Sequence, residues 1–192
     1  MITPGHIAAS YLISGFPIRP KEKLRSIETL FIVFSGNSFD LDFFLPPLFG
    51  YPGGLHHYLP THTPIFGIVL FSILYFLFRK KFSTKTFILA GVAMASHLVL
   101  DDFNHLLGWL NLDSGITSTP QILWEYPFNL GRKKTLHEAL EFYKNNPTSN
   151  AEILSIYTKS KLFVAEIITV VVALLVFTKD RISYTGKTKE KK

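Results

Sequence analysis

Apolar runs along the chain predict a set of helices. The three strongest runs are Pro64–Phe78, residues 86–100 and residues 162–178. Two weaker segments, residues 6–18 and 27–34, predict shorter or half-buried helices. A capping hydroxyl at Thr63, followed by proline at the first helical position, predicts where the first run begins as a helix. We therefore predict an all-α fold.

The composition indicates that these helices contact lipid. Hydrophobic residues make up 47% of the 192 residues, and the chain has 18 Phe. This richness is more typical of a lipid-facing surface than of a small soluble core. Each run is shorter than the roughly 20 residues that cross a hydrocarbon core. Flanking residues therefore extend the helices, or the protein thins the bilayer or crosses it only in part.

We expect a small polytopic membrane helical bundle in a single domain, residues 1–178. Within this domain, residues 113–150 mix Pro, Gly and charged residues, and we expect them to form an extracytoplasmic loop or cap over the site. Residues 179–192 form a basic tail that we expect to be cytoplasmic and disordered. Because residues 1–15 contain neither a basic segment nor a small-residue cleavage site, no removable signal peptide is expected.

The net charge of +6 is distributed in short clusters between the apolar runs and in the tail. This distribution favours contact with anionic lipid headgroups and argues against nucleic acid as a partner. The positive-inside rule places three of these clusters on the cytoplasmic side, near residues 20–25, 79–85 and 179–192. All seven histidines then lie on or near the opposite side. We therefore predict a multi-pass protein of the cell membrane with an extracytoplasmic site.

Histidine and aspartate side chains gather at one end of a predicted hairpin. His57 and His62 stand just before the first apolar run, and His97 and Asp101 stand near the end of the second. The short basic link at residues 79–85 joins these runs, so both pairs should arrive at the same end. Ionisable groups at the edge of hydrocarbon are rare unless they pair, line a cavity or coordinate an ion. The pattern therefore predicts a metal site.

The residue types at this site limit the choice of metal. The chain has no cysteine, so any metal must use nitrogen and oxygen ligands, which suits zinc and also manganese or iron. His97 and Asp101 are four residues apart and share a helix face, and a cation would offset the unfavourable helix dipole at Asp101. Asp40 and Asp42 alternate with apolar residues, so in extended geometry their carboxylates would point the same way. They could bridge two ions, or one could bind while the other orients a histidine.

Short motifs around these residues resemble a known family. They are an early His6, the element Phe39-Asp40-Leu41-Asp42, the element from His57 to Thr61-His62-Thr63, and Ser96-His97 followed by Asp101. On these residues the chain resembles the YdjM-like family of membrane-bound metal-dependent hydrolases. That family has Pro-Asp-x-Asp, His-Arg-Gly-x-Thr-His-Ser and Ser-His-x-x-x-Asp elements. Here Phe39 replaces the proline, Tyr58 and Leu59 replace Arg-Gly, and Thr63 replaces the serine, so metal binding carries over more firmly than substrate choice.

The resemblance implies hydrolysis of a phosphoester or lipid-like substrate by metal-activated water. It implies a ligand set drawn from His6, Asp40, Asp42, His57, His62, His97 and Asp101. His62, His97 and Asp101, with one or both of Asp40 and Asp42, are the foremost ligands, and His6 and His57 are ligands or orient them. A carboxylate that does not bind the metal would act as general base. The predicted catalytic residues are Asp42 and Asp101, and Asp101 is also a predicted ligand.

Other interpretations stay open. Arg132, Lys133 and Lys134 could hold an anionic phosphate group, although a solvated cluster of loop charges is the commoner reading. Glu166 is interpreted as an interfacial carboxylate. The expected partners are membrane lipids and a small-molecule or lipid-like substrate. The alternative to an enzyme is a transporter or a metal-binding scaffold, and the lack of ionisable groups in residues 65–78 and 86–95 argues against transport.

Overall fold

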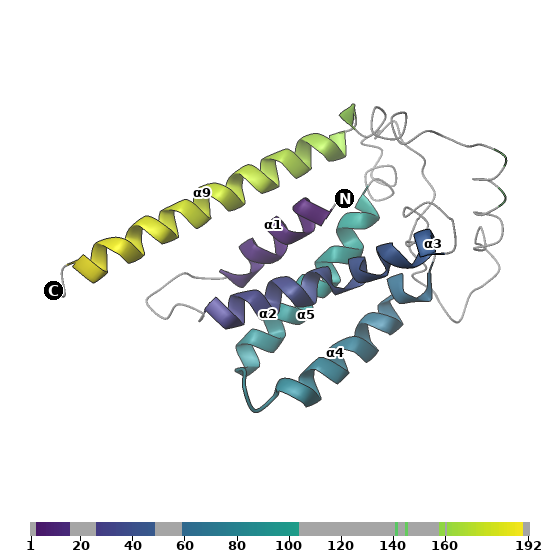
Figure 1. The fold of residues 1–192 in the computed structure, drawn as a ribbon, viewed down its shortest axis with the longest axis horizontal. Coiled ribbons are helices and arrows are strands. Elements are labelled where there is room, and N and C mark those ends of the chain that lie inside the picture. The colour runs from purple at the N-terminus through teal and green to yellow at the C-terminus, as the bar shows by residue number, and fades with distance from the viewer. Residues whose placement is uncertain are drawn as a thin grey trace.

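The structure is a computed structural model that describes residues 3–15, 26–48, 59–103 and 161–189, and positions 141, 145, 158 and 159. Within these residues all regular secondary structure is helical, which confirms the all-α prediction (Figure 1). Helix α5 (Thr84–Asp101) contacts α1 (Thr3–Ser14), α2 (Ser26–Asn37) and α4 (Pro64–Phe78). Helix α5 is therefore the centre of the bundle, and it carries part of the predicted site.

Helices α4 and α5 form the hairpin that the apolar runs predicted. The Thr63 hydroxyl accepts a hydrogen bond from the Phe66 N–H and caps α4, with proline at the first helical position. The Ser83 hydroxyl likewise accepts from the Thr86 N–H and caps α5. Each cap satisfies a first-turn donor that has no acceptor within its own helix. Because the chain reverses between these caps, the start of α4 and the end of α5 lie at the same end of the bundle (Figure 1).

Small residues bring α1 and α2 close to α5. A Cβ atom at Gly36 of α2 would overlap Ser10 Oγ of α1 and approach Ala93 Cβ of α5 to 3.0 Å. Helix α1 turns a stripe of polar side chains towards this contact, because His6, Ser10 and Ser14 recur every four residues and are all buried. Close contact among the three helices thus fixes the middle of α1, one turn away from His6.

Two apolar clusters fill the rest of the bundle. The larger cluster lies between α2, α4 and α5 and consists of Phe31, Ile32, Leu74, Phe82, Phe87, Leu89, Ala90 and Ala93. The smaller cluster lies nearer the predicted site and consists of Phe39, Met94 and Leu98. The larger cluster packs α4 and α5 of the hairpin against α2, and the smaller one contacts the histidines through Phe39.

Asp40 and Asp42 lie on the 3-10 helix η1 (Ser38–Phe44), which directly follows α2 and leads into the short helix α3 (Leu45–Leu48). The extended geometry considered from their alternation with apolar residues is therefore wrong. Local hydrogen bonds keep the chain helical at this point, because the Ser38 hydroxyl donates to the Ser35 carbonyl at 2.7 Å. With about three residues per turn, side chains two positions apart diverge by roughly 120° rather than pointing the same way.

Helix α9 (Lys161–Lys189) packs along α1, and the two helices run in the same direction (Figure 1). The Tyr11 and Phe177 rings meet edge to face with centroids 5.9 Å apart. The helix contains the predicted apolar run and continues to Lys189, although the sequence predicted disorder from residue 179. Extending an existing helix adds one hydrogen bond per residue and needs no new nucleus, which explains the extension.

Many large apolar side chains remain exposed. On α4 they include Ile68, Phe76 and Leu77, which are 66%, 67% and 69% exposed. Within the described residues, however, no helix combines the length and the apolar character needed to cross a membrane. The multi-pass arrangement therefore stays a prediction.

Candidate metal centre

His97 and Asp101 occupy the last two turns of α5. Their four-residue spacing places His97 Nε2 3.1 Å from Asp101 Oδ2, and both side chains are fully buried. The Asp102 N–H donates to the Leu98 carbonyl where the helix ends. A carboxylate near a helix C-terminus is disfavoured by the helix dipole, and a bound cation would offset that penalty.

His62 enters from the short 3-10 helix η3 (Pro60–His62), directly before α4. Its Nε2 atom lies 3.7 Å from Asp101 Oδ2, and the imidazole is fully buried. The other ring nitrogen, Nδ1, lies 2.9 Å from Asp42 Oδ2. The Thr61 hydroxyl donates to the same carboxylate oxygen. A proton on Nδ1 would hydrogen-bond to Asp42 and leave the Nε2 lone pair directed at the cluster.

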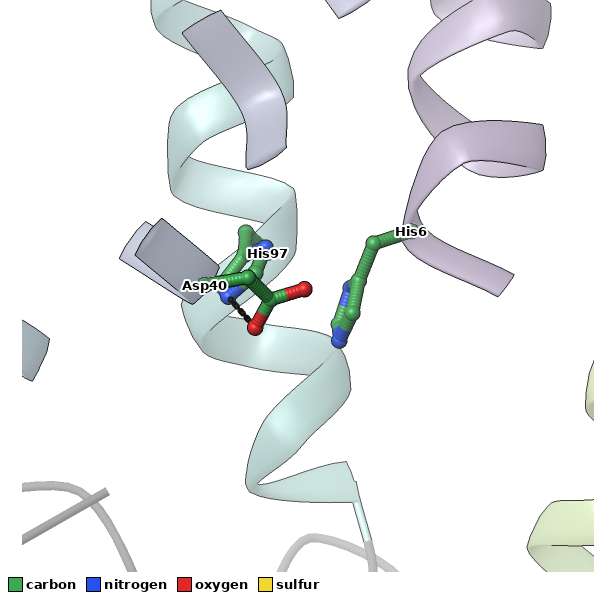
Figure 2. A group of neighbouring side chains, drawn as sticks. All are labelled: His6, Asp40 and His97. Atoms are coloured by element: carbon green, nitrogen blue, oxygen red, sulfur yellow. Dashed lines mark ion pairs between the residues drawn. The ribbon is translucent and has the colours of Figure 1, made fainter. Parts of the chain in front are cut away.

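His6 and Asp40 approach His97 from two other elements, α1 and η1, as Figure 2 shows. The His6 and His97 rings stack with centroids 3.9 Å apart. His6 Nε2 lies 2.7 Å from Asp101 Oδ1, and Asp40 Oδ1 lies 3.5 Å from His97 Nε2. Three segments, α1, η1 and η3, therefore meet α5 at His97.

The separations between these atoms suit a divalent ion. Two groups of side chains each bring their ligand atoms within 4.8 Å of one another, namely His62, His97 and Asp101, and His6, Asp40 and His97. Ligands bound tetrahedrally about 2.0–2.2 Å from a zinc ion lie about 3.3–3.6 Å apart. The distances of His97 Nε2 from Asp101 and Asp40 and of His62 Nε2 from Asp101 are 3.1, 3.5 and 3.7 Å. These values lie close to that spacing.

The hydrogen bonding of His97 independently indicates a ligand. Both of its ring nitrogens are buried, and neither forms a hydrogen bond with the described residues. His6 Nδ1 and Asp42 Oδ1 are also buried without such a bond. Leaving a buried polar group unsatisfied costs about 1–3 kcal/mol, so such groups are rare and call for an explanation such as a bound ion. Metal coordination by His97 Nε2 would satisfy the atom at the centre of both groups.

A phenyl ring closes one side of the cluster. Phe39 is 1% exposed, and its ring centroid lies 5.3 Å from that of His97 and 5.7 Å from that of His62. Gly67 of α4 makes room for this ring, since a Cβ atom there would come within 2.9 Å of Phe39 Cζ. An apolar wall limits access of water and strengthens the electrostatic interactions inside the site.

The structure brings together every predicted ligand that it describes. His6, Asp40, His62, His97 and Asp101 form the two groups, while Asp42 reaches the cluster through His62. His57, the predicted cap at residues 113–150 and the cluster at residues 132–134 lie outside the described residues. Sequence reasoning missed the contribution of Phe39 and the hydroxyl of Thr61. Phe39 has no sequence signal beyond its position beside a predicted ligand, and Thr61 has in addition its place in the Thr-His motif element.

Comparison with known proteins identifies no relative. No family model, no curated protein and no solved structure matches the chain. The resemblance to the YdjM-like family therefore stays a prediction from short motifs. The case for a metal centre depends on the geometry of the cluster itself.

Proposed function

We propose that this protein is a membrane-associated, metal-dependent hydrolase that binds zinc through His62, His97 and Asp101. The observation that carries the proposal is the buried His97 imidazole, which forms no hydrogen bond with the described residues and belongs to both groups of nitrogen and oxygen ligands. Imidazole and carboxylate ligands suit zinc, and they also suit manganese and iron. A bound zinc ion lowers the pKa of a coordinated water to about 7 and polarises the attacked phosphoryl or acyl oxygen.

The carboxylates have different tasks in this proposal. Asp101 is the ligand shared by the surrounding imidazoles, since its two oxygens face His6 and His97. Asp42 orients His62, which is the orienting role that the sequence left open for one of the two aspartates. Asp40 is the candidate general base, because its side chain is 14% exposed and is the most accessible of the three carboxylates. This assignment moves the base from Asp42 to Asp40, since Asp42 Oδ2 already contacts two donors.

Membrane association is supported by the apolar surface and by the charges beside it. Helix α4 has no charged residue and exposes large aliphatic and aromatic side chains along much of its length. Arg79, Lys80, Lys81 and Lys85 are exposed at the hairpin turn, where they could contact anionic headgroups. With this turn on the cytoplasmic side, the metal centre at the opposite end of the hairpin would face the extracytoplasmic side. A phosphoester or lipid-like substrate suits this location.

A metal-binding scaffold is the alternative function. The observation in its favour is the burial of the histidines, since His6, His62 and His97 are each at most 1% exposed. Structural zinc sites are closed, whereas catalytic sites keep one position open to water or substrate. In the hydrolase proposal, Asp40 is the most exposed of the three carboxylates in the cluster, and the substrate would enter from its side.

Hydrolysis assays separate the two functions. Metal-free protein and protein reloaded with zinc, manganese or iron(II) would be assayed on a phosphodiester, a phosphomonoester and a carboxylic ester. The hydrolase proposal expects metal-dependent turnover of at least one substrate class, lost in His97→Ala and retained in Asp102→Asn. Bound metal without turnover on any substrate would support the scaffold.

The orientation has a separate test. Because the chain has no cysteine, a single Lys81→Cys variant provides one labelling site at the hairpin turn. A membrane-impermeant thiol reagent should leave this variant unlabelled in intact cells and label it after permeabilisation. Labelling of intact cells would contradict the proposed orientation.

A further inference from the structure

Glu166 is a buried carboxyl group on an otherwise apolar stretch of α9. It is 3% exposed, whereas Val164 and Ile167 beside it are 56% and 47% exposed. The sequence suggested an interfacial carboxylate at this position. The structure instead turns the side chain inward, against α1.

The Glu166 side chain contacts the first turn of α1. Its Oε1 atom accepts a hydrogen bond of 3.1 Å from the backbone N–H of Gly5, the third residue of the helix. Amides in the first turn have no acceptor within the helix, and a carboxyl group there is also favoured by the helix dipole. Glu166 therefore caps α1 from a different helix, across 161 positions of sequence.

The capped amide immediately precedes a residue of the metal centre. Gly5 is followed by His6, whose ring stacks on His97 at 3.9 Å and lies 2.7 Å from Asp101. Both contacts are short, so a small shift of the first turn of α1 would disturb them. The middle of α1 is fixed where Ser10 meets Gly36. The hydrogen bond to Glu166 fixes the end that carries His6.

We propose that Glu166 is a positioning residue of the metal centre, which clamps the first turn of α1 and thereby sets the position of the His6 imidazole. This inference rests on the proposed function, because it requires the cluster to bind a divalent ion. Groups that orient metal ligands from outside the coordination sphere typically contribute 10- to 100-fold to metal affinity. Glu166 acts one step further away, through the backbone, so we expect an effect of about tenfold.

Cobalt(II) is a suitable probe, since its visible absorption reports the coordination geometry of a zinc site. Glu166→Ala removes the acceptor and should weaken cobalt affinity about tenfold while changing the absorption spectrum. Glu166→Gln keeps a side-chain oxygen in place and should remain close to the parent protein. Phe177→Ala is the matched control, because it weakens the same α1–α9 interface at the Tyr11 contact, more than one helical turn from His6 along α1. This control should leave cobalt affinity unchanged.

A double-mutant cycle separates positioning from general stability. In a His6→Gln background, Glu166→Ala should have no further effect on cobalt affinity if Glu166 acts through His6. If Glu166→Ala fails to fold, as judged by circular dichroism, Glu166→Asp enters the same cycle, because its shorter side chain withdraws from Gly5.

The outcomes distinguish this inference from the proposed function. Equal cobalt affinity and spectra in the parent protein and in Glu166→Ala, or in Glu166→Asp where it takes the place of Glu166→Ala, would overturn the positioning role alone. Equal losses from Glu166→Ala with and without His6 would also overturn it. A parent protein that binds no cobalt would overturn the proposed function and this inference with it.

Discussion

Asp42→Asn tests whether this carboxylate orients His62 or binds the metal itself. Asp42 Oδ2 accepts from the Thr61 hydroxyl and lies 2.9 Å from His62 Nδ1. The asparagine side chain can present its amide oxygen to both groups, so the cluster keeps its shape and loses a negative charge. For an orienting carboxylate we expect metal affinity to fall by 10- to 100-fold. This loss corresponds to about 1.4–2.8 kcal/mol of binding free energy.

Asp42→Ala should behave differently. Asp42→Ala removes the carboxylate that contacts the fully buried His62 and the half-buried Thr61. Losing this contact costs about 1–3 kcal/mol of stability for each buried group. Because Thr61 retains some contact with water, the free energy of unfolding should fall by about 2–4 kcal/mol. Asp42→Asn should lose much less of this stability.

Competition with a chromogenic chelator measures zinc affinity in both variants, and urea unfolding of the metal-free protein measures stability. Asp102→Asn is a matched control, because it removes a buried carboxylate that follows Asp101 in sequence and belongs to neither ligand group. Zinc affinity of Asp42→Asn within threefold of the parent protein would refute the orienting role. Complete loss of binding would instead identify Asp42 as a direct ligand.

Three further predictions follow from packing and from the site. Phe39→Ala should lower the free energy of unfolding by about 3–5 kcal/mol, because the ring is fully buried against His62 and His97; a loss below about 1 kcal/mol in urea unfolding would contradict this packing. Gly36→Ala should cost about 1–3 kcal/mol through overlap with Ser10 Oγ, and Ser10→Ala should recover part of that loss. A neutral Gly36→Ala in thermal unfolding would show that the helices are not in such close contact. Zinc at about 100 times its Kd should stabilise the parent protein by about 2.7 kcal/mol, seen as a rise in Tm that disappears in His97→Ala. An identical Tm with zinc and with a chelator would contradict a folded metal site.

The hairpin and the meeting of His62 with His97 and Asp101 could be predicted from the sequence. Both follow from local rules, because a capped apolar run, a short basic link and a second apolar run leave few ways to arrange the chain. The four-residue spacing of His97 and Asp101 is likewise a property of a single helix. These local features account for one of the two ligand groups.

The remainder of the site depends on tertiary packing. His6 reaches Asp101 across 95 positions of sequence, because α1 packs against α5 where the small residues permit close approach. The Asp40 and Asp42 side chains point in different directions because hydrogen bonds at the end of α2 keep the following residues helical. The alternation of polar and apolar residues does not show that a helix is preferred to a strand here. Glu166 accepts a hydrogen bond from Gly5 of a different helix, and no pattern in the sequence relates these two positions.

The most direct test of a metal centre is the metal content of the purified protein. Parent protein, Asp101→Asn and Asp102→Asn would be purified without chelators, incubated with equal zinc, desalted and analysed by mass spectrometry for zinc, manganese and iron. We predict stoichiometric metal in the parent protein and in Asp102→Asn, with most of it lost from Asp101→Asn. Equal metal content in Asp101→Asn and the parent protein would contradict the ligand set, and a parent protein that retains no metal would contradict the metal centre altogether.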